Sequence, residues 1–483
     1  MVQQSSLLFF AITVSAALAT IDERDFAPSN IITKDVAVIG GGAAGAYASV
    51  RLREDHNISI ALIELESELG GHVDTYTVPD SGETIEYGVQ SYVPYGPALD
   101  FFDRFDIQTE PFASRRLTGL YVEYESSKIL TGYTPPSANA TNEALRIWLS
   151  IVEKYNPLIE PGFWNFPSPT DIPADFLTPF GEFAKRYNVQ AAAPRIATIS
   201  NVGANGLEKL LTLDVIQEFG LPLTKSVLES SLFKPIGSNQ LLYRRVLELL
   251  KKDVYLNAKV TETERTASGV KVVVKGGDGT AGPILIKAKR LLFTPPPRFD
   301  FLSKFDTDEK EREVFGKLAT TWRFAGVAHI PCIPENYSVT YTSSGAVPDN
   351  YLKIRDYAWN LGLTSTGPTG LGLFRVLFGG NTSYTIDEAK SFVQAKVQDL
   401  VNAGSLNATV ECKVAFKAFV NHNSVLWPGA AELKGGFVQK LNGLQGYRST
   451  WWTGGKWCSD YTSNVWVFTE TVLDRLLKSL GKK

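Results

Sequence analysis

The apolar residues near the start of this chain fall into short runs, each closed by glycine or by an acidic residue. The run DVAVI (35–39) is rich in β-branched residues and ends at glycine, which predicts a buried parallel strand. The next segment, AAGAYASVRLRE (43–54), carries small residues on its first turns and predicts a helix. A second apolar run, ISIALIE (58–64), predicts a strand that ends at Glu64. Together the three segments predict a β-α-β unit.

Later parts of the chain also show the hydrophobic patterns of strands and of helices. VKVVVKGGDG (270–279) and ILIKAKRLLFTPPP (284–297) predict two strands joined by a Gly-Asp-Gly turn. LEKLLTLDVIQEFG (207–220) and EAKSFVQAKVQDLVNAG (388–404) have the spacing of amphipathic helices.

Residues 155–181 are rich in proline and aromatic residues, so they cannot form a regular helix or a central strand. Two interpretations stay open: the aromatic side chains line a cavity or lid, or they pin a long loop to the surface. The residues concerned are Phe163, Trp164, Phe166, Phe176 and Phe180.

The turn between the first strand and the helix reads Gly40-Gly41-Gly42-Ala43-Ala44-Gly45 and matches G-x-G-x-x-G. Gly40 permits the tight turn, Gly42 lets the backbone approach a pyrophosphate, and Gly45 lets the helix lie close to the sheet. The helix N-terminus offers N–H groups and a partial positive charge to the phosphates. Glu64 lies 19 residues beyond Gly45, where a carboxylate accepts hydrogen bonds from ribose hydroxyls. The combination predicts a dinucleotide-binding site.

A glycine pair, Gly70-Gly71, begins six residues after Glu64. A strand, an acidic residue and such a pair resemble the flavin-containing amine oxidase superfamily, in which the pair passes close to the cofactor. That family usually has arginine after the pair, and this chain has His72. Residues 85–92, IEYGVQSY, then resemble the family's acidic-x-Gly segment, which runs along the flavin.

Further segments resemble the same superfamily in the same order. KPIGSNQLLYRRVLELL (234–250) is similar to a P-x-G-G-x-x-x-L segment, with Ser238 in place of the second glycine and available to cap the following helix. KVTETE (259–264) resembles the strand whose valine, here Val260, lies against adenine.

The C-terminal TWWTGGKWCSDYTSNVWVFTE (450–470) resembles the last flavin-binding segment, and looks most like that of fungal beta-cyclopiazonate dehydrogenases. There a strand ending in glycine leads to a helix whose first turn meets the flavin ring. By position, Gly454 and Gly455 match the strand end, and Trp466, Val467 and Phe468 match the helix start. A helix dipole there stabilises the negative charge that reduction places on a flavin.

The resemblance implies FAD as cofactor and an α/β fold: a Rossmann-type FAD-binding domain, three-layered around a mostly parallel sheet, with an interleaved α+β substrate domain, as in amine oxidases and glutathione reductase. It assigns 30–95, 225–300 and 440–480 to the FAD-binding domain, and 96–224 and 301–439 to the substrate domain. The cofactor-binding residues it implies are Gly40, Gly42, Ala43, Ala44, Gly45, Glu64, Leu65, Gly70, Gly71, His72, Gly88, Val89, Gln90, Val260, Gly454, Gly455, Trp466, Val467 and Phe468.

Composition narrows the classes of function. The 48 Lys+Arg and 51 Asp+Glu leave a net charge of -3, so no basic excess is present to bind a nucleic-acid backbone. No H-x-x-x-H, C-x-x-C or carboxylate cluster predicts a metal site. No apolar stretch reaches the ~18 residues of a membrane span.

The N-terminus has the pattern of an export signal. An apolar run from Leu7 to Leu18 ends in Ala17-Leu18-Ala19, an A-x-A cleavage pattern. It predicts a signal peptide over residues 1–19 and a protein that is secreted or enters the secretory-pathway lumen; the alternative is an uncleaved apolar tail. Five N-x-S/T sequons agree with export and glycosylation: Asn57, Asn139, Asn336, Asn381 and Asn407.

Only three cysteines occur, so at most one intramolecular disulfide can form. The pairing Cys332–Cys412 is a guess, because sequence cannot fix it, and it would leave Cys458 as a free thiol.

The catalytic residues stay open. Amine oxidases have a lysine near the flavin that helps oxygen react, and the matching stretch FGKLATTWRFAGVAHI (315–330) offers Lys317 and Arg323. Trp452 is a further candidate because such a ring can face a substrate and exclude water. The alternative is that Trp451 and Trp452 alternate on a strand between two core layers. The histidines that could act as bases are His72, His329 and His422.

Three functions compete on this basis. The first is an FAD-dependent dehydrogenase or oxidase that transfers a hydride from a hydrophobic small molecule, such as an amine or a secondary metabolite, to the flavin, with O2 or another oxidant as electron acceptor. The second is a flavin-dependent double-bond isomerase of unsaturated fatty acids. The third is a non-catalytic relative that keeps FAD as structural support.

Overall fold

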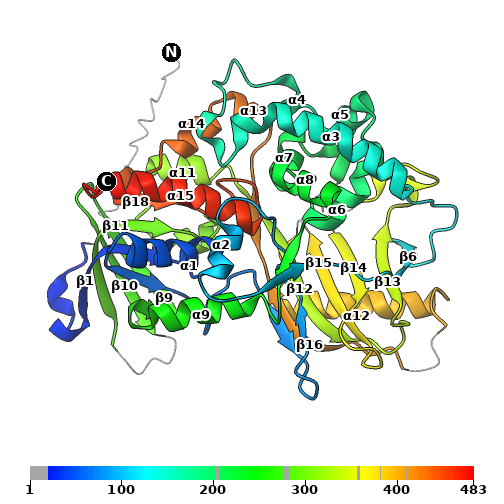
Figure 1. Ribbon diagram of the computed structural model, residues 1–483, viewed down its shortest axis with the longest axis horizontal. Helices are drawn as coiled ribbons and strands as arrows, with labels where there is room; N and C mark the ends of the chain where they lie inside the picture. Colours follow the sequence, from blue (N-terminus) through cyan, green and yellow to red (C-terminus); the bar gives the residue numbers. More distant parts are fainter. Residues whose placement is uncertain are drawn as a thin grey trace, which may run out of the picture.

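The computed structural model describes residues 20–202, 206–276, 282–355, 359–380, 382–407 and 411–482. Two seven-stranded sheets organise this part of the chain, and they lie side by side with helices packed around them (Figure 1). The predicted signal peptide, residues 1–19, lies outside the described residues.

The first sheet contains the chain's N-terminal strand and its C-terminal strand. Its order is β8-β2-β1-β11-β10-β9, and β18 also pairs with β11. Strands β8, β2, β1, β11 and β18 pair in parallel, whereas β10 pairs antiparallel with both β11 and β9. The strands are β1 (Ile31–Ile39), β2 (Ile60–Ile63), β8 (Val254–Tyr255), β9 (Ala258–Arg265), β10 (Val270–Gly276), β11 (Ile284–Phe293) and β18 (Thr450–Trp452).

The predicted β-α-β unit is present. The last four residues of β1 are buried, as expected for a strand covered on both faces. Helix α1 (Ala43–Val50) follows and continues as one π-helical turn, Arg51–Asp55. The long C-terminal helix α15 (Thr462–Ser479) packs against α1 on the same side of the sheet (Figure 1). Its buried positions, such as Val472 and Leu476, join the core of the first sheet.

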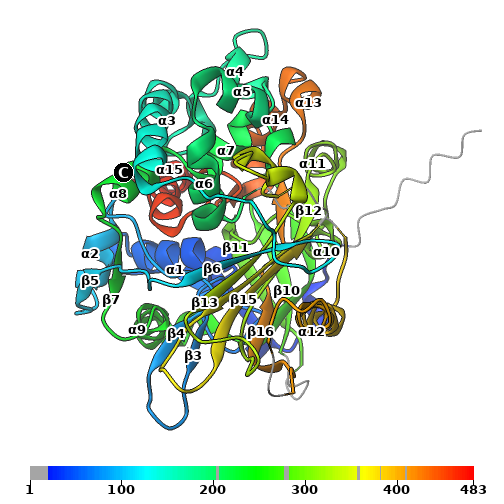
Figure 2. The same ribbon diagram turned by 90° about the vertical axis from the view of Figure 1, so that its right-hand side faces the viewer.

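The second sheet is mostly antiparallel. Its order is β16-β12-β15-β14-β13-β6, with β17 also paired to β12 and only β13 and β6 parallel. Helix α12 (Ile386–Asn402) covers one face, as Figure 2 shows, and the amphipathic pattern of 388–404 is thereby confirmed. The strands are β6 (Thr118–Glu123), β12 (Ala319–His329), β13 (Tyr337–Thr342), β14 (Trp359–Ser365), β15 (Leu373–Gly380), β16 (Ala415–Asn421) and β17 (Ser424–Leu426).

A layer of helices stands above both sheets (Figure 1). The proline- and aromatic-rich segment lies here. Its first residues, 155–159, form the end of α3 with Pro157 inside the helix, so the prediction that the segment cannot form a regular helix is wrong at this end. Its phenylalanines are buried: Phe176 and Phe180 have no exposed surface. The aromatic side chains therefore build a core, which neither the cavity nor the surface-loop interpretation anticipated. The helices are α3 (Ala138–Ile159), α4 (Ala174–Leu177), α5 (Phe180–Tyr187), α6 (Ala193–Ser200), α7 (Thr212–Glu218) and α8 (Leu221–Glu229).

Shorter elements connect these layers. A hairpin, β3 (Thr75–Thr77) with β4 (Thr84–Glu86), lies against the second sheet, and β5 (Thr109–Pro111) pairs with β7 (Phe233–Pro235). The remaining helices are α2 (Ala98–Asp103), α9 (Gln240–Leu250), α10 (Phe299–Leu302), α11 (Glu309–Phe315), α13 (Ala430–Lys434) and α14 (Phe437–Asn442). None of the helices in the described ranges is both long and apolar enough to span a membrane.

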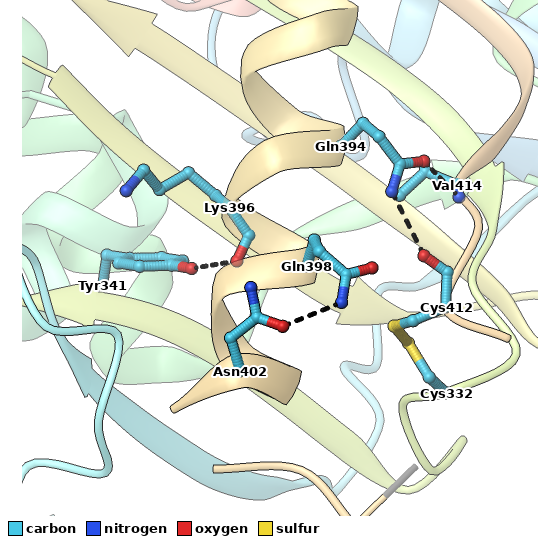
Figure 3. Close-up of a disulfide and its surroundings, with 8 residues drawn as sticks. All are labelled: Cys332, Tyr341, Gln394, Lys396, Gln398, Asn402, Cys412 and Val414. Atoms are coloured by element: carbon cyan, nitrogen blue, oxygen red, sulfur yellow. Dashed lines mark hydrogen bonds between the residues drawn. A yellow bond between two sulfur atoms is a disulfide. The ribbon is translucent and has the colours of Figure 1, made fainter. Parts of the chain in front are cut away.

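One disulfide links the segment that follows β12 to the segment that precedes β16, at one end of this antiparallel strand pair. Cys332 is bonded to Cys412, which is the pairing that the sequence left as a guess, and Cys458 is a buried free thiol. Gln394 on α12 holds the Cys412 segment by donating to the Cys412 carbonyl at 3.1 Å and accepting from the Val414 amide at 2.8 Å (Figure 3). The disulfide therefore lies within a segment that is also bonded to α12.

A buried ion network ties β9 to α11. The Arg265 guanidinium has no exposed surface; its Nη1 and Nη2 donate to Glu311 at 2.6 and 2.7 Å, and its Nε donates to Asp306 at 2.7 Å. Arg448 bonds the same two carboxylates. Removing one member would leave an uncompensated charge in the interior.

We expect Glu311→Ala to lower the free energy of unfolding by about 3–5 kcal/mol, because it leaves Arg265 buried with one partner fewer. Chemical denaturation followed by tryptophan fluorescence measures the change. The matched control is Glu313→Ala on the same helix, which breaks only an exposed pair with Lys440 and should change stability little. Equal losses in the two variants would contradict the role assigned to the network.

Candidate active site

The glycine-rich turn holds α1 directly against the end of β1. The Gly40 amide donates to the Ile63 carbonyl at 2.8 Å. A Cβ placed on Gly45 would lie 1.8 Å from the Gly40 carbonyl oxygen, so only glycine fits there. Gly42 precedes the helix and has no side chain to cap it, so the first amides of α1, from Ala43 and Ala44, have no intrahelical acceptor. This N-terminus can accept a phosphate group.

Glu64 lies directly after β2 and is 8% exposed. Its Oε2 accepts from the Gly41 amide at 2.6 Å and its Oε1 from the Glu66 amide at 2.8 Å. Burial raises the pKa of Glu64, and these amides pull it back toward its usual value. A carboxylate has about four acceptor positions, so two stay free for ribose hydroxyls. The Ala258 amide donates to the Glu64 carbonyl, which brings β9 and Val260 to the same place.

The Gly70-Gly71 turn packs directly against the glycine-rich turn at residues 40–45. Gly42 and Gly70 form a β-bridge, and a Cβ on Gly71 would lie 2.8 Å from the Gly42 Cα. A side chain at Gly71 would clash with the backbone of Gly42, so the two turns can pack this closely only because glycine is present. Leu65, from the same predicted set, is 48% exposed and lies at the outer edge of this region.

Residues 88–90 run beside His72. The Val89 amide donates to the His72 carbonyl at 3.0 Å, and a Cβ on Gly88 would lie 2.1 Å from that oxygen. Gln90 donates to the Glu86 carbonyl at 3.3 Å. Asn239 donates from Nδ2 to the Val89 carbonyl.

The expectation that Ser238 caps α9 is wrong. The residue before the helix is Asn239, and neither side chain caps the first turn. The Asn239 side chain bonds the 88–90 segment instead, because that segment passes close to the start of α9.

The last flavin-like segment lies at this junction too, with one correction. Helix α15 begins at Thr462, so Trp466, Val467 and Phe468 belong to its second turn and not to its start. Trp466 is fully buried and donates from Nε1 to the Ala43 carbonyl at 3.0 Å, which fastens α15 to α1. Phe468 is 2% exposed and stacks on Trp164.

The first turn of α15 is formed by Thr462, Ser463 and Asn464, which sequence reasoning missed. The run of three small polar residues after Tyr461 was the signal for a helix start. Ser463 anchors this turn, because its hydroxyl donates to the Val93 carbonyl at 2.7 Å and accepts from the Val93 amide at 3.1 Å.

Two glycines separate β18 from this helix. Gly454 has φ +117°, a conformation that disfavours any side chain, and its Cβ would meet the Thr294 carbonyl. A Cβ on Gly455 would lie 1.9 Å from Asp460 Oδ1. The turn is therefore folded onto the Asp460 side chain.

Asp460 belongs to a cluster of charged residues from distant parts of the chain. Lys456 Nζ lies 2.8 Å from Asp460 and 3.0 Å from Glu218 on α7. Burial raises the pKa of Asp460, but Lys456, Arg323 and His72 outweigh it and hold that pKa below its usual range. Burial lowers the pKa of Lys456, and Asp460 and Glu218 outweigh it in the opposite direction. Both groups are charged at neutral pH.

His72 faces this cluster. Its side chain is exposed, yet burial lowers its pKa, with His422 the next largest cause. The exposed side of His72 is therefore accessible while the rest of its ring is surrounded by protein. His422 stacks on the His72 ring at 4.3 Å, and its Nε2 lies 2.6 Å from Asp74 Oδ2. We use the name chamber for the region around four interacting side chains, those of His72, His422, Arg323 and Asp460.

Glu160 lies behind the first turn of α15. Its Oε1 accepts from the Ser459 hydroxyl at 2.7 Å, while its Oε2 is buried and has no partner within the described residues. Burial raises the pKa of Glu160 to about 7, and Ser459 and Asn464 only reduce the rise. A neutral carboxylic acid can therefore be present beside the chamber near pH 7.

The structure places the three candidate catalytic residues in different environments. Arg323, on β12, lies close enough to Asp460 and His72 to shift their pKa values. Lys317 is exposed on the turn after α11, near Glu313, and does not reach the cluster. Trp452 has no exposed surface and packs among Phe293, Phe315 and Trp457, so its ring faces no space open to a substrate.

These features fit FAD, because the two glycine turns, which we call the cradle, present backbone without side chains, next to the free amides at the start of α1 and the buried carboxylate of Glu64. Residues predicted at 40–45, 64, 70–72, 88–90 and 260 lie close together.

Comparison with known proteins agrees with this geometry. A family model described as an NAD(P)-binding Rossmann-like domain matches residues 38–105. The FAD-dependent oxidoreductase pigF of Monascus ruber is 32% identical over 457 residues, covering 93% of each chain. Beta-cyclopiazonate dehydrogenase of Aspergillus oryzae is 29% identical over 481 residues, covering 98% of each.

Two solved structures show the same fold. A fatty acid isomerase from P. acnes that produces CLA has a TM-score of 0.67 at 18% identity, covering 92% of this chain and 98% of the isomerase. A triple mutant of putrescine oxidase has a TM-score of 0.61 at 16% identity, covering 93% and 100%.

The fold and the cradle together define an FAD-dependent oxidoreductase with the architecture of the flavin-containing amine oxidases. The chain belongs to the family of FAD-dependent oxidoreductases that includes pigF and beta-cyclopiazonate dehydrogenase.

We expect Glu64→Ala to weaken FAD binding by roughly 10- to 100-fold, because it removes charge-assisted hydrogen bonds to the ribose. Titration of deflavinated protein with FAD, followed by flavin fluorescence, gives the dissociation constant. Glu66→Ala, an exposed change two residues away, is the matched control. Wild-type affinity in the Glu64 variant would contradict the assignment.

A second prediction concerns pH. Folding raises the pKa of Glu160 from 4.5 to about 7, so the stability from its bound proton is fully present below pH 4.5 and lost as pH rises through 7. Glu160→Gln keeps an acceptor for Ser459 and stays uncharged. Its free energy of unfolding relative to wild type should therefore rise by up to about 3 kcal/mol between about pH 5 and pH 8. Glu153→Gln, exposed on the same helix, should show no comparable trend in urea unfolding.

Proposed function

We propose that this enzyme oxidises a hydrophobic small molecule, an amine or a compound with an activated C–H bond, in the chamber next to the FAD cradle. The observation that carries the proposal is the electrostatic interaction between His72, which follows the Gly70-Gly71 turn, and Asp460, which follows the Gly454-Gly455 turn. Both turns match flavin-binding segments, so a substrate in the chamber would lie beside the flavin.

The side chains supply proton transfer and charge. FAD, when bound, supplies the hydride acceptor. Burial and His422 lower the pKa of His72, so it is neutral at pH 7, and Asp460 favours its protonated form, so His72 can accept the proton that a two-electron oxidation releases from the substrate. Asp460 stays ionised and stabilises positive charge that develops on His72 or on the substrate. The stacked His422 and its partner Asp74 hold the His72 ring in place.

The relatives support a small-molecule substrate, since one of them is named for its action on beta-cyclopiazonate. The electrons then pass to O2 or to another oxidant. The likeness to a fatty acid isomerase concerns the fold alone, so isomerisation and a non-catalytic role are outcomes that the experiment below distinguishes.

We also propose that the protein enters the secretory pathway and is glycosylated. Supporting features are the apolar N-terminal run, the Cys332–Cys412 disulfide, which suits an oxidising compartment, and four exposed sequon asparagines: Asn57, Asn139, Asn336 and Asn407. The fifth, Asn381, lies outside the described residues.

The test begins with purified protein, which should be yellow. Amines, amino acids, indoles and unsaturated fatty acids are then mixed with it anaerobically, and loss of flavin absorbance is followed by stopped flow. One class should bleach the flavin and give an oxidised product. A product of unchanged mass without lasting bleaching would favour isomerisation, and no reaction with any donor would favour a non-catalytic role.

With a reducing donor in hand, His72→Gln should slow bleaching by roughly 10²- to 10⁴-fold, the usual contribution of a general base. His56→Gln, distant from the chamber in the loop before β2, is the control. Unchanged bleaching in the His72 variant would exclude it as the base.

A further inference from the structure

The face of the second sheet opposite α12 carries an unusual row of residues. Side chains directly opposite one another in a sheet point to the same face. Arg375 on β15 is opposite Val327 on β12 and opposite Thr364 on β14, and Thr364 is opposite Ser338 on β13. The other face, with Phe374 and Val376, packs on α12. Arg375, Thr364 and Ser338 therefore form one polar row on the face away from α12.

Open space lies next to this row. Gly362, two residues before Thr364, points to the same face, and a Cβ placed there would meet no atom within 4 Å. Its neighbour Leu377 is only partly buried. On the β12 side, Ala325 and Val327 are covered by the β3–β4 hairpin and are buried. The open space is therefore on the β14 side of Arg375, with an apolar floor.

Arg375 has no counter-charge. Its Nε is buried without a hydrogen-bond partner, and no carboxylate pairs with it among the described residues. Burial alone lowers its pKa to about 10, so it is still charged at neutral pH. Arg375 is partly buried, and a partly buried guanidinium without an ionic partner is costly, a cost that an apolar residue of similar size would avoid. Thr364, opposite it, also forms no hydrogen bond through its hydroxyl within the described part of the chain.

The row lies at a defined distance from the chamber. Arg323 and Val327 are four residues apart on one strand and share a face, so Arg323 and Arg375 are separated by roughly 13 Å along the sheet. Arg323 lies at the chamber end, near His72 and Asp460. One end of this sheet face therefore lies at the chamber, where the proposed oxidation takes place. Arg375, a positive charge without an ionic partner among the described residues, lies away from that end.

We propose that Arg375 binds an oxyanion of the substrate, a carboxylate or a deprotonated enol, with the Thr364 hydroxyl as a second donor. Planar oxyanions match the two-pronged geometry of guanidinium, and such bonds are the strong ones among hydrogen bonds. The proposal rests on the proposed function and narrows its substrate class to amphipathic acids: an apolar body over Leu377 and Gly362, with the reacting carbon toward the chamber.

The test uses octanoate and its neutral analogue octanol as probes. Each is titrated into the FAD-loaded enzyme by calorimetry at neutral pH. Wild type should bind octanoate at least tenfold more tightly than octanol. Arg375→Met should weaken octanoate binding by tenfold or more and leave octanol unchanged, whereas Arg375→Lys should retain part of the preference. Arg146→Met, the same change at an exposed position on α3, is the control.

A purely structural arginine gives a different pattern. If Arg375 exists to bind a ligand, Arg375→Met should melt no lower than wild type, because it removes an uncompensated charge. Equal affinity of wild type for octanoate and octanol, no octanoate binding, or a preserved preference in Arg375→Met overturns the proposal. If Arg375→Met does not fold, the octanoate and octanol affinities of wild type and of Arg375→Lys still test the proposal. A holoenzyme that no donor reduces contradicts the proposed oxidation, while calorimetry continues to test Arg375.

Discussion

The hydrogen bond from the Trp466 indole to the Ala43 carbonyl is the contact on which the site depends. Ala43 is the first residue of the helix that follows the glycine turn, and Trp466 lies in the helix that closes the chain. The indole also stacks on Tyr47 and Tyr92 at 5.8 and 5.7 Å. Because the ring is completely buried, this bond cannot be exchanged for one with water without opening the core.

Once those two helices are joined, the charges of the chamber come together as a consequence. Asp460 and Lys456 are brought to the chamber by the turn before α15, His72 by the turn after the second glycine pair, and Arg323 by the second sheet. Each buried charge needs a partner, and most have one: Lys456 has two carboxylates, and Arg265 has two more. Arg375 is only partly buried, but it has no ionic partner among the described residues and its Nε is buried without a hydrogen bond, which is why it points to a ligand.

The elements predicted best are those in which the signal is local. The turn at 40–45, the strand ending at Glu64 and the helix at 388–404 follow from short-range periodicity and from backbone demands that only glycine meets. The start of α15 was placed four residues late, because Trp466 matched a family pattern while the polar run Thr462–Asn464 marked the actual start.

The rest depended on contacts between residues far apart in the sequence. No sequence motif marks Lys456. Its place in the charged cluster follows from an ion pair with Glu218, on a helix more than two hundred residues earlier. Trp452 looked like an active-site ring until β18 placed it between Phe293 and Phe315. Burial, which decides whether a histidine or an arginine is functional, is a property of the assembled sheets and not of local sequence.

The order of the segments along the chain has a consequence for biosynthesis. Trp466 leaves the ribosome 423 residues after Ala43. A nascent chain can fold much of its first sheet and still lack the indole that fastens α15 to α1. The complete coenzyme site can therefore form only after α15 has been synthesised, and a product truncated before this helix would be released colourless.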